Sequence, residues 1–268
     1  MPKLTLPDGR ALAYREVGHG APLVLVHGSP GDGRAWAKVA SRLAGQFRVL
    51  TPDLPGYGES DPLPEAASGR TAAMAAAVAA LIAACGEPAW LCGHSYGGNV
   101  ALHASLQQAQ MIMGLGLFEP VCFRALALAG QRQILESATQ FFQSYTDRVV
   151  AGDVDAVADM VDYWFGAGTF PQFPQPMQAY LRGAAAANAT DVRAAFDEAL
   201  TVRQLADFSR PTLLAYGDCS PAVVPAIIAA LGRLLANAQS RTIRGASHGM
   251  LDSHPDAVAA MIAELAPR

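Results

Sequence analysis

Residues 93–97 read Gly-His-Ser-Tyr-Gly, between an apolar run at 89–92 and a helical pattern that continues to about 108. A serine at a sharp strand-to-helix turn takes a strained backbone conformation, so the residues two positions away must be small. Gly93 and Gly97 meet this requirement. We therefore predict that Ser95 is a nucleophile whose hydroxyl is lifted out of a sheet, with the Tyr96 N–H beside any oxyanion formed there.

A serine hydroxyl is a poor nucleophile until a neighbouring imidazole removes its proton. The chain has six histidines. Of these, His248 lies in a loop rich in glycine, alanine and serine after the last predicted strand, and we predict it as the general base. We expect structural roles for His27, His94 and His103, and a surface or helix-capping role for His254.

These residues must be positioned by the elements around them, and short apolar runs alternate with helical patterns along the chain. The predicted strands are two short runs around 7–9 and the segments 22–28, 48–53, 89–93, 113–120, 212–218 and 239–243. Helical patterns at 33–45, 71–84 and 97–108 lie between them, and others follow the last two strands. This alternation predicts an α/β fold with a mostly parallel eight-stranded sheet and helices on both faces.

Residues 122–205 interrupt the alternation, because they contain several helical patterns and no convincing strand. We predict a helical cap at 122–205, inserted into a core formed by residues 1–121 and 206–268. Half of the chain's aromatic residues (3 Trp, 7 Tyr and 10 Phe) lie between Phe123 and Tyr180, so the cap has material for a small core of its own. Because it follows the end of a strand, we expect the cap at the carboxyl edge of the sheet, where open α/β sheets bind ligands, with a few of its aromatics lining a pocket.

Composition narrows the class of protein. The formal net charge is -4 and no long Lys/Arg run occurs, so the basic footprint of a nucleic-acid-binding protein is missing. The N-terminal residues show no apolar signal-peptide core, and the segment nearest to a membrane span, 71–85, is too short and alanine-rich. We expect a cytoplasmic protein with a small-molecule substrate and no membrane or nucleic-acid partner, and we leave a homo-oligomer open.

The four cysteines form no Cys-x-x-Cys pair and no zinc-like spacing with histidine. We expect reduced thiols, and neither a metal nor a cofactor.

Together with the turn at Ser95, three segments resemble the α/β-hydrolase fold family over nearly the whole chain. VHGSPGDGRAW (26–36) is similar to the family's His-Gly oxyanion loop, and TPDLPGYGESD (51–61) to its Asp-x-Pro-Gly-x-Gly-x-Ser segment. IRGASHGMLDSHPDAV (243–258) is similar to the loop that carries the catalytic histidine. The resemblance points to the serine-nucleophile, esterase-like branch. It implies an oxyanion hole from the backbone N–H groups of Ser29 and Tyr96, with the Ser29 hydroxyl either a third donor or an ordinary turn hydroxyl before Pro30.

The carboxylate partner of His248 departs from the commoner family pattern. In the family this acid usually follows the seventh strand as Gly-x-x-Asp, but here Ser220 stands three residues after Gly217, and Asp218 comes two positions early. A second family position follows the sixth strand, where this chain has Glu119, as in those haloalkane dehalogenases whose acid lies there. Their nucleophile is aspartate, so this chain is not one of them. We favour Glu119 and keep Asp218 as the alternative.

The predicted reaction is two-step acyl transfer on a small apolar ester through an acyl-enzyme, as in a carboxylesterase. A carbon–carbon bond hydrolase or lyase would use the same triad on a diketone or cyanohydrin. A ligand sensor on a hydrolase fold is an alternative of another class, but a damaged triad would mark it, and Ser95 and His248 are both present.

Overall fold

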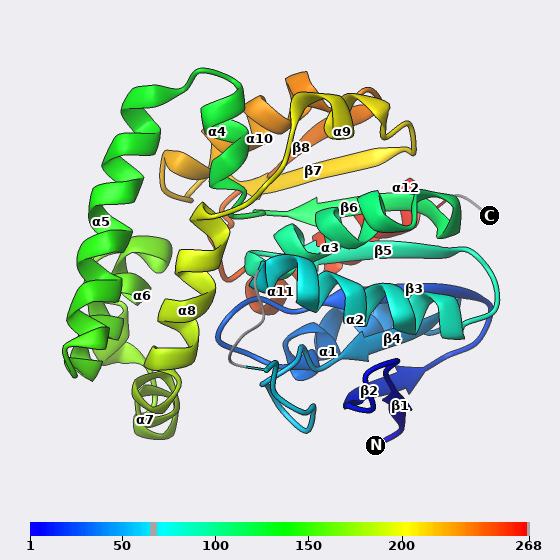
Figure 1. Ribbon diagram of the computed structural model, residues 1–268, viewed down its shortest axis with the longest axis horizontal. Coiled ribbons are helices and arrows are strands. Elements are labelled where there is room, and N and C mark those ends of the chain that lie inside the picture. The colour runs from blue at the N-terminus through cyan, green and yellow to red at the C-terminus, as the bar shows by residue number, and fades with distance from the viewer. Residues whose placement is uncertain (65–68, 267–268) are drawn as a thin grey trace.

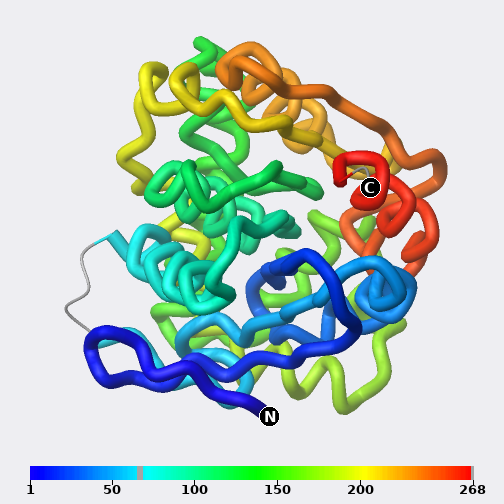
Figure 2. The backbone as a smooth tube through the Cα atoms, turned by 90° about the vertical axis from the view of Figure 1, so that its right-hand side faces the viewer, coloured from blue at the N-terminus to red at the C-terminus, as the bar shows by residue number. Residues whose placement is uncertain are grey.

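The computed structural model describes residues 1–64 and 69–266, in which eight strands form one twisted sheet (Figure 1). The strands are β1 (Lys3–Thr5), β2 (Ala11–Val17), β3 (Ala21–Val26), β4 (Phe47–Pro52), β5 (Ala89–His94), β6 (Ile112–Phe118), β7 (Thr212–Gly217) and β8 (Ala238–Ile243). Their order is β1-β2-β4-β3-β5-β6-β7-β8, with β2 antiparallel to both of its neighbours and every other pair parallel. The N-terminal hairpin and β8 lie at opposite edges (Figure 2). The predicted mostly parallel eight-stranded sheet is confirmed.

Helices cover both faces of the sheet. On one face lie α1 (Ala37–Leu43), α11 (Met250–Ser253) and α12 (Pro255–Leu265), and on the other α2 (Arg70–Ala84), α3 (Tyr96–Gln107) and α10 (Val223–Leu234). In β3, Leu23 and Leu25 belong to the hydrophobic cluster on the face covered by α1 and α12. Val24 and Val26 belong to the cluster on the face covered by α2 and α3. The continuous apolar run therefore reflects a strand buried on both faces. The helix predicted at 33–45 divides into a 3₁₀ turn at Gly33–Trp36 followed by α1.

All regular structure between β6 and β7, a segment that is described throughout, is helical. It comprises α4 (Phe123–Leu128), α5 (Arg132–Val150), α6 (Val157–Phe165), α7 (Gln175–Gly183), α8 (Ala185–Phe196) and α9 (Val202–Asp207), with 3₁₀ turns at Val154–Ala156 and Phe170–Gln172. We call residues 122–205 the helical insertion. Its helices α5 to α8 stand beside the end of the sheet where β6 ends (Figure 1). Several of its aromatic rings pack against one another, with Phe142 in contact with Phe123, Phe141 and Trp164.

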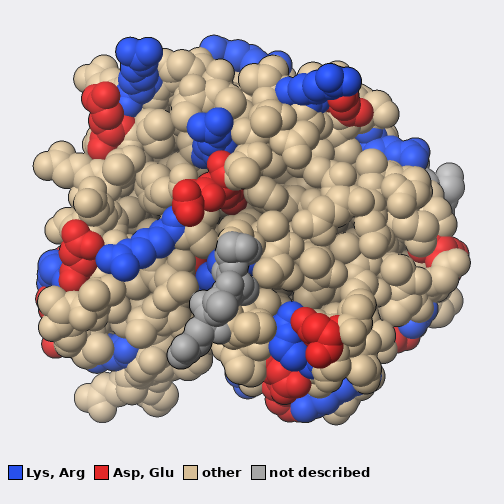
Figure 3. Space-filling view, in the orientation of Figure 1, with Lys and Arg blue, Asp and Glu red and all other residues tan. Residues whose placement is uncertain are grey.

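The described surface carries charges of both signs. On the face in Figure 3, basic side chains lie dispersed, several beside acidic ones. Ion pairs among the described residues include Arg148–Asp153 and Arg193–Asp147. Within residues 1–64 and 69–266, no helix is both long and apolar enough to cross a membrane. All four cysteines are described and are free, and the same residues contain no cluster of His, Cys, Asp or Glu suited to a metal ion.

Candidate active site

Ser95 lies at the sharp turn between β5 and α3. Its backbone has φ 55° and ψ -126°, a conformation that non-glycine residues rarely adopt. A Cβ on Gly97 would lie 2.2 Å from the carbonyl oxygen of His27, and a Cβ on Gly93 would lie 2.2 Å from that of Gly97. The turn therefore requires glycine at both positions, because any side chain there would collide with backbone.

His248 lies between Ser95 and Glu119 and contacts both. Its Nε2 is 2.9 Å from Ser95 Oγ, and its Nδ1 is 2.7 Å from Glu119 Oε2. The His248 side chain is 6% exposed and that of Glu119 is 0% exposed, so both hydrogen bonds are shielded from water. The three residues follow β5, β6 and β8, and the fold brings them together across 153 and 129 residues of sequence.

The environment of Glu119 keeps its carboxylate ionised and oriented. Burial alone would raise the pKa of this carboxyl, but hydrogen bonds from His248, Ser220 and the Gly217 N–H lower the pKa below its ordinary value. Glu119 Oε1 accepts from Gly217 N at 2.8 Å and from Ser220 Oγ at 2.6 Å, which leaves Oε2 for His248. Ser220 thus stands where the family's acid is usual and supports the carboxylate that follows β6.

Asp218, the alternative acid, is placed elsewhere. It is solvent-exposed, and its Oδ1 accepts hydrogen bonds from Gly245 N at 2.7 Å and from Cys219 Sγ at 3.5 Å. The carboxylate that the structure brings to His248 is therefore Glu119.

Aromatic rings enclose the imidazole of His248. The indole of Trp164, from the helical insertion, stacks on it with centroids 4.5 Å apart and an interplanar angle of 20°, and Phe165 approaches edge-on. His94 Nε2 donates to the His248 carbonyl oxygen at 2.9 Å. Burial and the nearby His248 lower the pKa of His94 to about 3, so His94 is a neutral, structural residue. Sequence reasoning did not single out Trp164, and its only signal was the aromatic-rich insertion.

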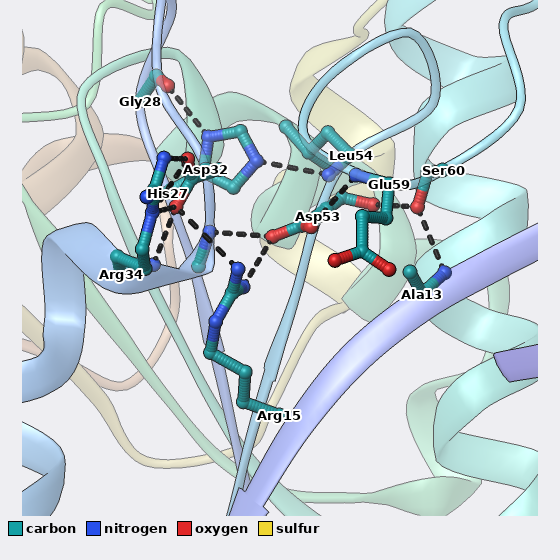
Figure 4. A network of polar contacts seen from close by, with 11 residues as sticks. Ala13, Arg15, His27, Gly28, Asp32, Arg34, Asp53, Leu54, Glu59 and Ser60 are labelled. Carbon is teal, nitrogen blue, oxygen red and sulfur yellow. Dashed lines mark hydrogen bonds and ion pairs between the residues drawn. The ribbon is translucent and has the colours of Figure 1, made fainter. Parts of the chain in front are cut away.

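The loop after β3 carries the predicted oxyanion donor Ser29 and is anchored by His27 (Figure 4). His27 Nδ1 donates to the Gly28 carbonyl at 2.7 Å, and the Leu54 N–H donates to Nε2 at 2.8 Å. Burial lowers the pKa of His27, and its neutral ring holds the loop in place. A Cβ on Gly28 would lie 3.0 Å from Ser95 Cβ, so the loop passes close to the nucleophile.

The hydroxyl of Ser29 is engaged away from Ser95. Tyr57 donates its phenolic proton to Asp191 Oδ2 at 2.5 Å, so its oxygen is free to accept from Ser29 Oγ at 2.8 Å. Of the two alternatives for this hydroxyl, the geometry favours an ordinary turn hydroxyl over a third oxyanion donor. In the part of the chain that the structure describes, the backbone N–H groups of Ser29 and Tyr96 donate no hydrogen bond to a protein acceptor, which leaves both available.

A cavity of about 30 Å³ lies next to Ser95, room for roughly two water molecules. Its polar lining is Ser29, Ser95, Asn188 and Asp191, and its apolar lining includes Val121, Phe123, Phe142, Met160, Trp164, Val192 and Ala195. Six of these seven apolar residues, all except Val121, come from the helices of the insertion, as do Asn188 and Asp191. The cavity therefore lies between Ser95 and the helical insertion.

A mostly parallel sheet with a serine at a strand-to-helix turn, hydrogen-bonded to a histidine–carboxylate pair, defines the class of α/β hydrolases. The chain belongs to the alpha/beta hydrolase family, whose family model matches residues 23–261, and this confirms the resemblance seen in the sequence.

Individual relatives agree with this assignment. The chain is 30% identical over 267 residues to a pimeloyl-acyl-carrier-protein methyl ester esterase of Edwardsiella ictaluri, covering 96% of this chain and 97% of that protein. It superposes on an esterase from Thermogutta terrifontis with a TM-score of 0.74 and 27% identity, covering 98% and 96% of the two chains. A partial match is to the dihydrolipoyllysine-residue acetyltransferase component of the acetoin cleaving system of Cupriavidus necator. The identity is 35% over 133 residues, which cover 49% of this chain and 35% of that protein.

Proposed function

We propose that this chain is a carboxylesterase-like serine hydrolase that cleaves small apolar esters through an acyl-enzyme. The observation that carries the proposal is the unbroken hydrogen-bond series from Ser95 Oγ through His248 to Glu119. Each member has the role that acyl transfer requires: a nucleophile, a base and a carboxylate that orients the base. The esterases among the relatives support an ester as the substrate.

In the first step, Ser95 Oγ attacks the ester carbonyl carbon and its proton passes to His248 Nε2. The carbonyl oxygen becomes an oxyanion, which the N–H groups of Ser29 and Tyr96 stabilise. The imidazolium is stabilised by Glu119 and returns the proton to the departing alcohol. In the second step, His248 activates a water molecule that releases the acid and regenerates Ser95.

The aromatic lining of the cavity supports an apolar substrate. Phe123, Phe142 and Trp164 present ring surface beside Ser95. Asp191, the charged residue of the described lining, accepts a hydrogen bond from Arg70. The Arg70–Asp191 pair leaves no free charge on the described lining to select a charged group on the substrate.

The experiment is hydrolysis of p-nitrophenyl acetate, butyrate and octanoate by the wild type and by Ser95→Ala, combined with fluorophosphonate labelling. We expect turnover of the shorter esters, loss of turnover in the variant, and a label on the peptide that contains Ser95. Absence of both ester turnover and labelling would refute the proposal. Cleavage of a 1,3-diketone at a higher kcat/KM than any ester would instead favour carbon–carbon bond hydrolysis by the same residues.

A further inference from the structure

Two buried polar residues of α8 contact the oxyanion loop from the side of the helical insertion. Asn188 is 2% exposed and Asp191 is 0% exposed, and a spacing of three residues places them on one face of the helix. Burying such groups costs free energy unless each finds a hydrogen-bond partner. Their partners therefore show what this face of α8 holds in place.

Asn188 holds Ser29 directly. Its Nδ2 donates to the Ser29 carbonyl oxygen at 3.0 Å and lies 3.1 Å from Ser29 Oγ. On the other side, the Tyr145 hydroxyl donates to Asn188 Oδ1 at 2.7 Å. Because a backbone carbonyl can only accept, the amide nitrogen must face Ser29 and the amide oxygen must face Tyr145. The orientation of the Asn188 amide is thus determined by its partners.

Asp191 holds the same serine through one intermediate residue. Its Oδ2 accepts from the Tyr57 hydroxyl, which in turn accepts from Ser29 Oγ, and its Oδ1 accepts from Arg70 Nε at 2.5 Å. Burial, and then the neighbouring Asp191, raise the pKa of Tyr57, so its phenol stays protonated and remains a donor. The Ser29 hydroxyl therefore donates its proton to Tyr57 and accepts from Asn188, and both of these side chains are held by other residues.

The anchors from the hydrolase core reach the residues on either side of Ser29. His27 holds the Gly28 carbonyl, and Asp53 Oδ1 accepts from the Gly33 N–H at 2.9 Å and from Arg15 Nη1 at 2.6 Å (Figure 4). At Ser29 itself, the carbonyl contact comes from Asn188. The Gly28 carbonyl and the Ser29 N–H belong to the same planar peptide unit, so His27 orients this N–H from the core. Asn188 orients the next peptide unit, and thereby restrains the backbone angles of Ser29 from the side of the insertion.

We propose that Asn188 is a positioning residue, which acts together with His27 to hold the Ser29 N–H toward the oxyanion formed when Ser95 attacks, with Asp191 supporting Ser29 through Tyr57. This inference rests on the proposed esterase function and adds a part played by the helical insertion. The same helix lines the cavity, through Asn188, Asp191 and Val192. Movement of α8 away from the core would therefore widen the cavity and release Ser29 together, and its return would realign the donor over a bound ester.

The test compares Asn188→Ala with Thr190→Ala, a matched control on the same helix whose exposed hydroxyl donates to the Ala186 carbonyl oxygen. Four quantities are measured: kcat and KM on p-nitrophenyl butyrate, the Ki of an alkyl trifluoromethyl ketone, and the Kd of an unreactive ether of the same shape. The ketone carbon accepts Ser95 Oγ, the serine proton passes to His248, and the ketone oxygen becomes an oxyanion in the hole. The ether occupies the cavity but forms no oxyanion.

For Asn188→Ala we expect kcat to fall about 10- to 100-fold, less than the roughly 10²–10³ lost when an oxyanion donor is removed outright. The Ki of the ketone should rise by the same factor, while KM and the Kd of the ether stay within about threefold, since only oxyanion binding is changed. Tyr145→Phe, which keeps the ring and frees the Asn188 amide, should shift kcat and Ki in the same direction by less. Thr190→Ala should match the wild type.

Unchanged kcat and Ki in both Asn188→Ala and Tyr145→Phe would overturn the positioning role. So would an equal loss of ketone and ether binding, because that pattern reports a damaged cavity and not a misaligned donor. A wild type that neither hydrolyses the ester nor binds the ketone would overturn the proposed function itself. A wild type that does both, beside variants that behave like it, would overturn the role of Asn188 alone.

Discussion

Replacing Glu119 by glutamine is expected to reverse the tautomer of His248. The Gly217 N–H can only donate, and it lies 2.8 Å from Glu119 Oε1, so the amide oxygen of the new side chain must occupy that position. The amide nitrogen then faces His248 Nδ1, which has to accept a hydrogen bond. The imidazole proton moves to Nε2, 2.9 Å from Ser95 Oγ, and the ring can no longer take the serine proton.

The magnitude follows from this change of tautomer. The matching carboxylate-to-amide change in a serine protease triad lowers kcat by about 10⁴ with the geometry intact. At 1.36 kcal/mol for each tenfold change, this corresponds to about 5.4 kcal/mol of transition-state stabilisation. Glutamate and glutamine have nearly the same shape, and Ser220 keeps an acceptor at 2.6 Å, so the fold should be retained.

The assay is kcat on p-nitrophenyl butyrate for Glu119→Gln and for Asp218→Asn, with Tm as a check on folding. We expect a loss of about 10⁴ in the first variant and wild-type activity in the second, whose carboxylate is exposed and bonded to Gly245. A folded Glu119→Gln within tenfold of the wild type would refute the reasoning. So would a loss of several orders of magnitude in Asp218→Asn.

Three further predictions follow from other residues. Burial raises the pKa of Glu198 above its ordinary 4.5, so above that pH the folded state binds more protons than the unfolded state, and stability falls as the pH rises. In urea unfolding, the free energy of unfolding should therefore decrease more between pH 5 and pH 8 for the wild type than for Glu198→Gln. An equal decrease in both proteins would contradict this. Gly97→Ala should lower Tm or prevent folding, because its Cβ would lie 2.2 Å from the His27 carbonyl oxygen. Gly183→Ala is the control and should match the wild type, since a Cβ there would meet open space. A normal Tm and normal activity in Gly97→Ala would count against the tight turn. Phe142→Ala should lower the free energy of unfolding in urea by about 3–5 kcal/mol. By enlarging the cavity, it should also raise kcat/KM for p-nitrophenyl octanoate relative to that for the acetate. An unchanged ratio of the two kcat/KM values would place Phe142 outside the substrate's path.

Much of the fold could be predicted because its signals are local. The run from Pro22 to Val26 is apolar throughout, and a strand with this pattern is buried on both faces, which requires helices on each side of the sheet. The strand-to-helix turn was also visible, since Gly93 and Gly97 flank Ser95 at the positions where side chains collide with backbone. The break at residues 33–36 was missed, because a 3₁₀ turn and the α-helix that follows share one periodic pattern over so short a span.

The polar support of the oxyanion loop could not be predicted. Asn188 lies in an alanine-rich helix 159 residues after Ser29, and nothing in its neighbourhood marks it as different from a surface amide. Tyr57 lies in a segment that the sequence analysis had singled out, but its contact with Asp191 spans 134 residues. Such pairs form only when the insertion is placed on the core.

The sequence by itself determined the position of the turn that carries Ser95, the proposed nucleophile. The backbone of this turn admits only small residues at 93 and 97, so the constraint lies within five consecutive residues. The sequence also narrowed the partner of His248 to two carboxylates, Glu119 and Asp218. Only the tertiary structure decided between them. Adjacent parallel strands β6 and β7 bring the Gly217 N–H and Ser220 to Glu119, whose burial is then offset by hydrogen bonds, while Asp218 turns to solvent and the Gly245 N–H.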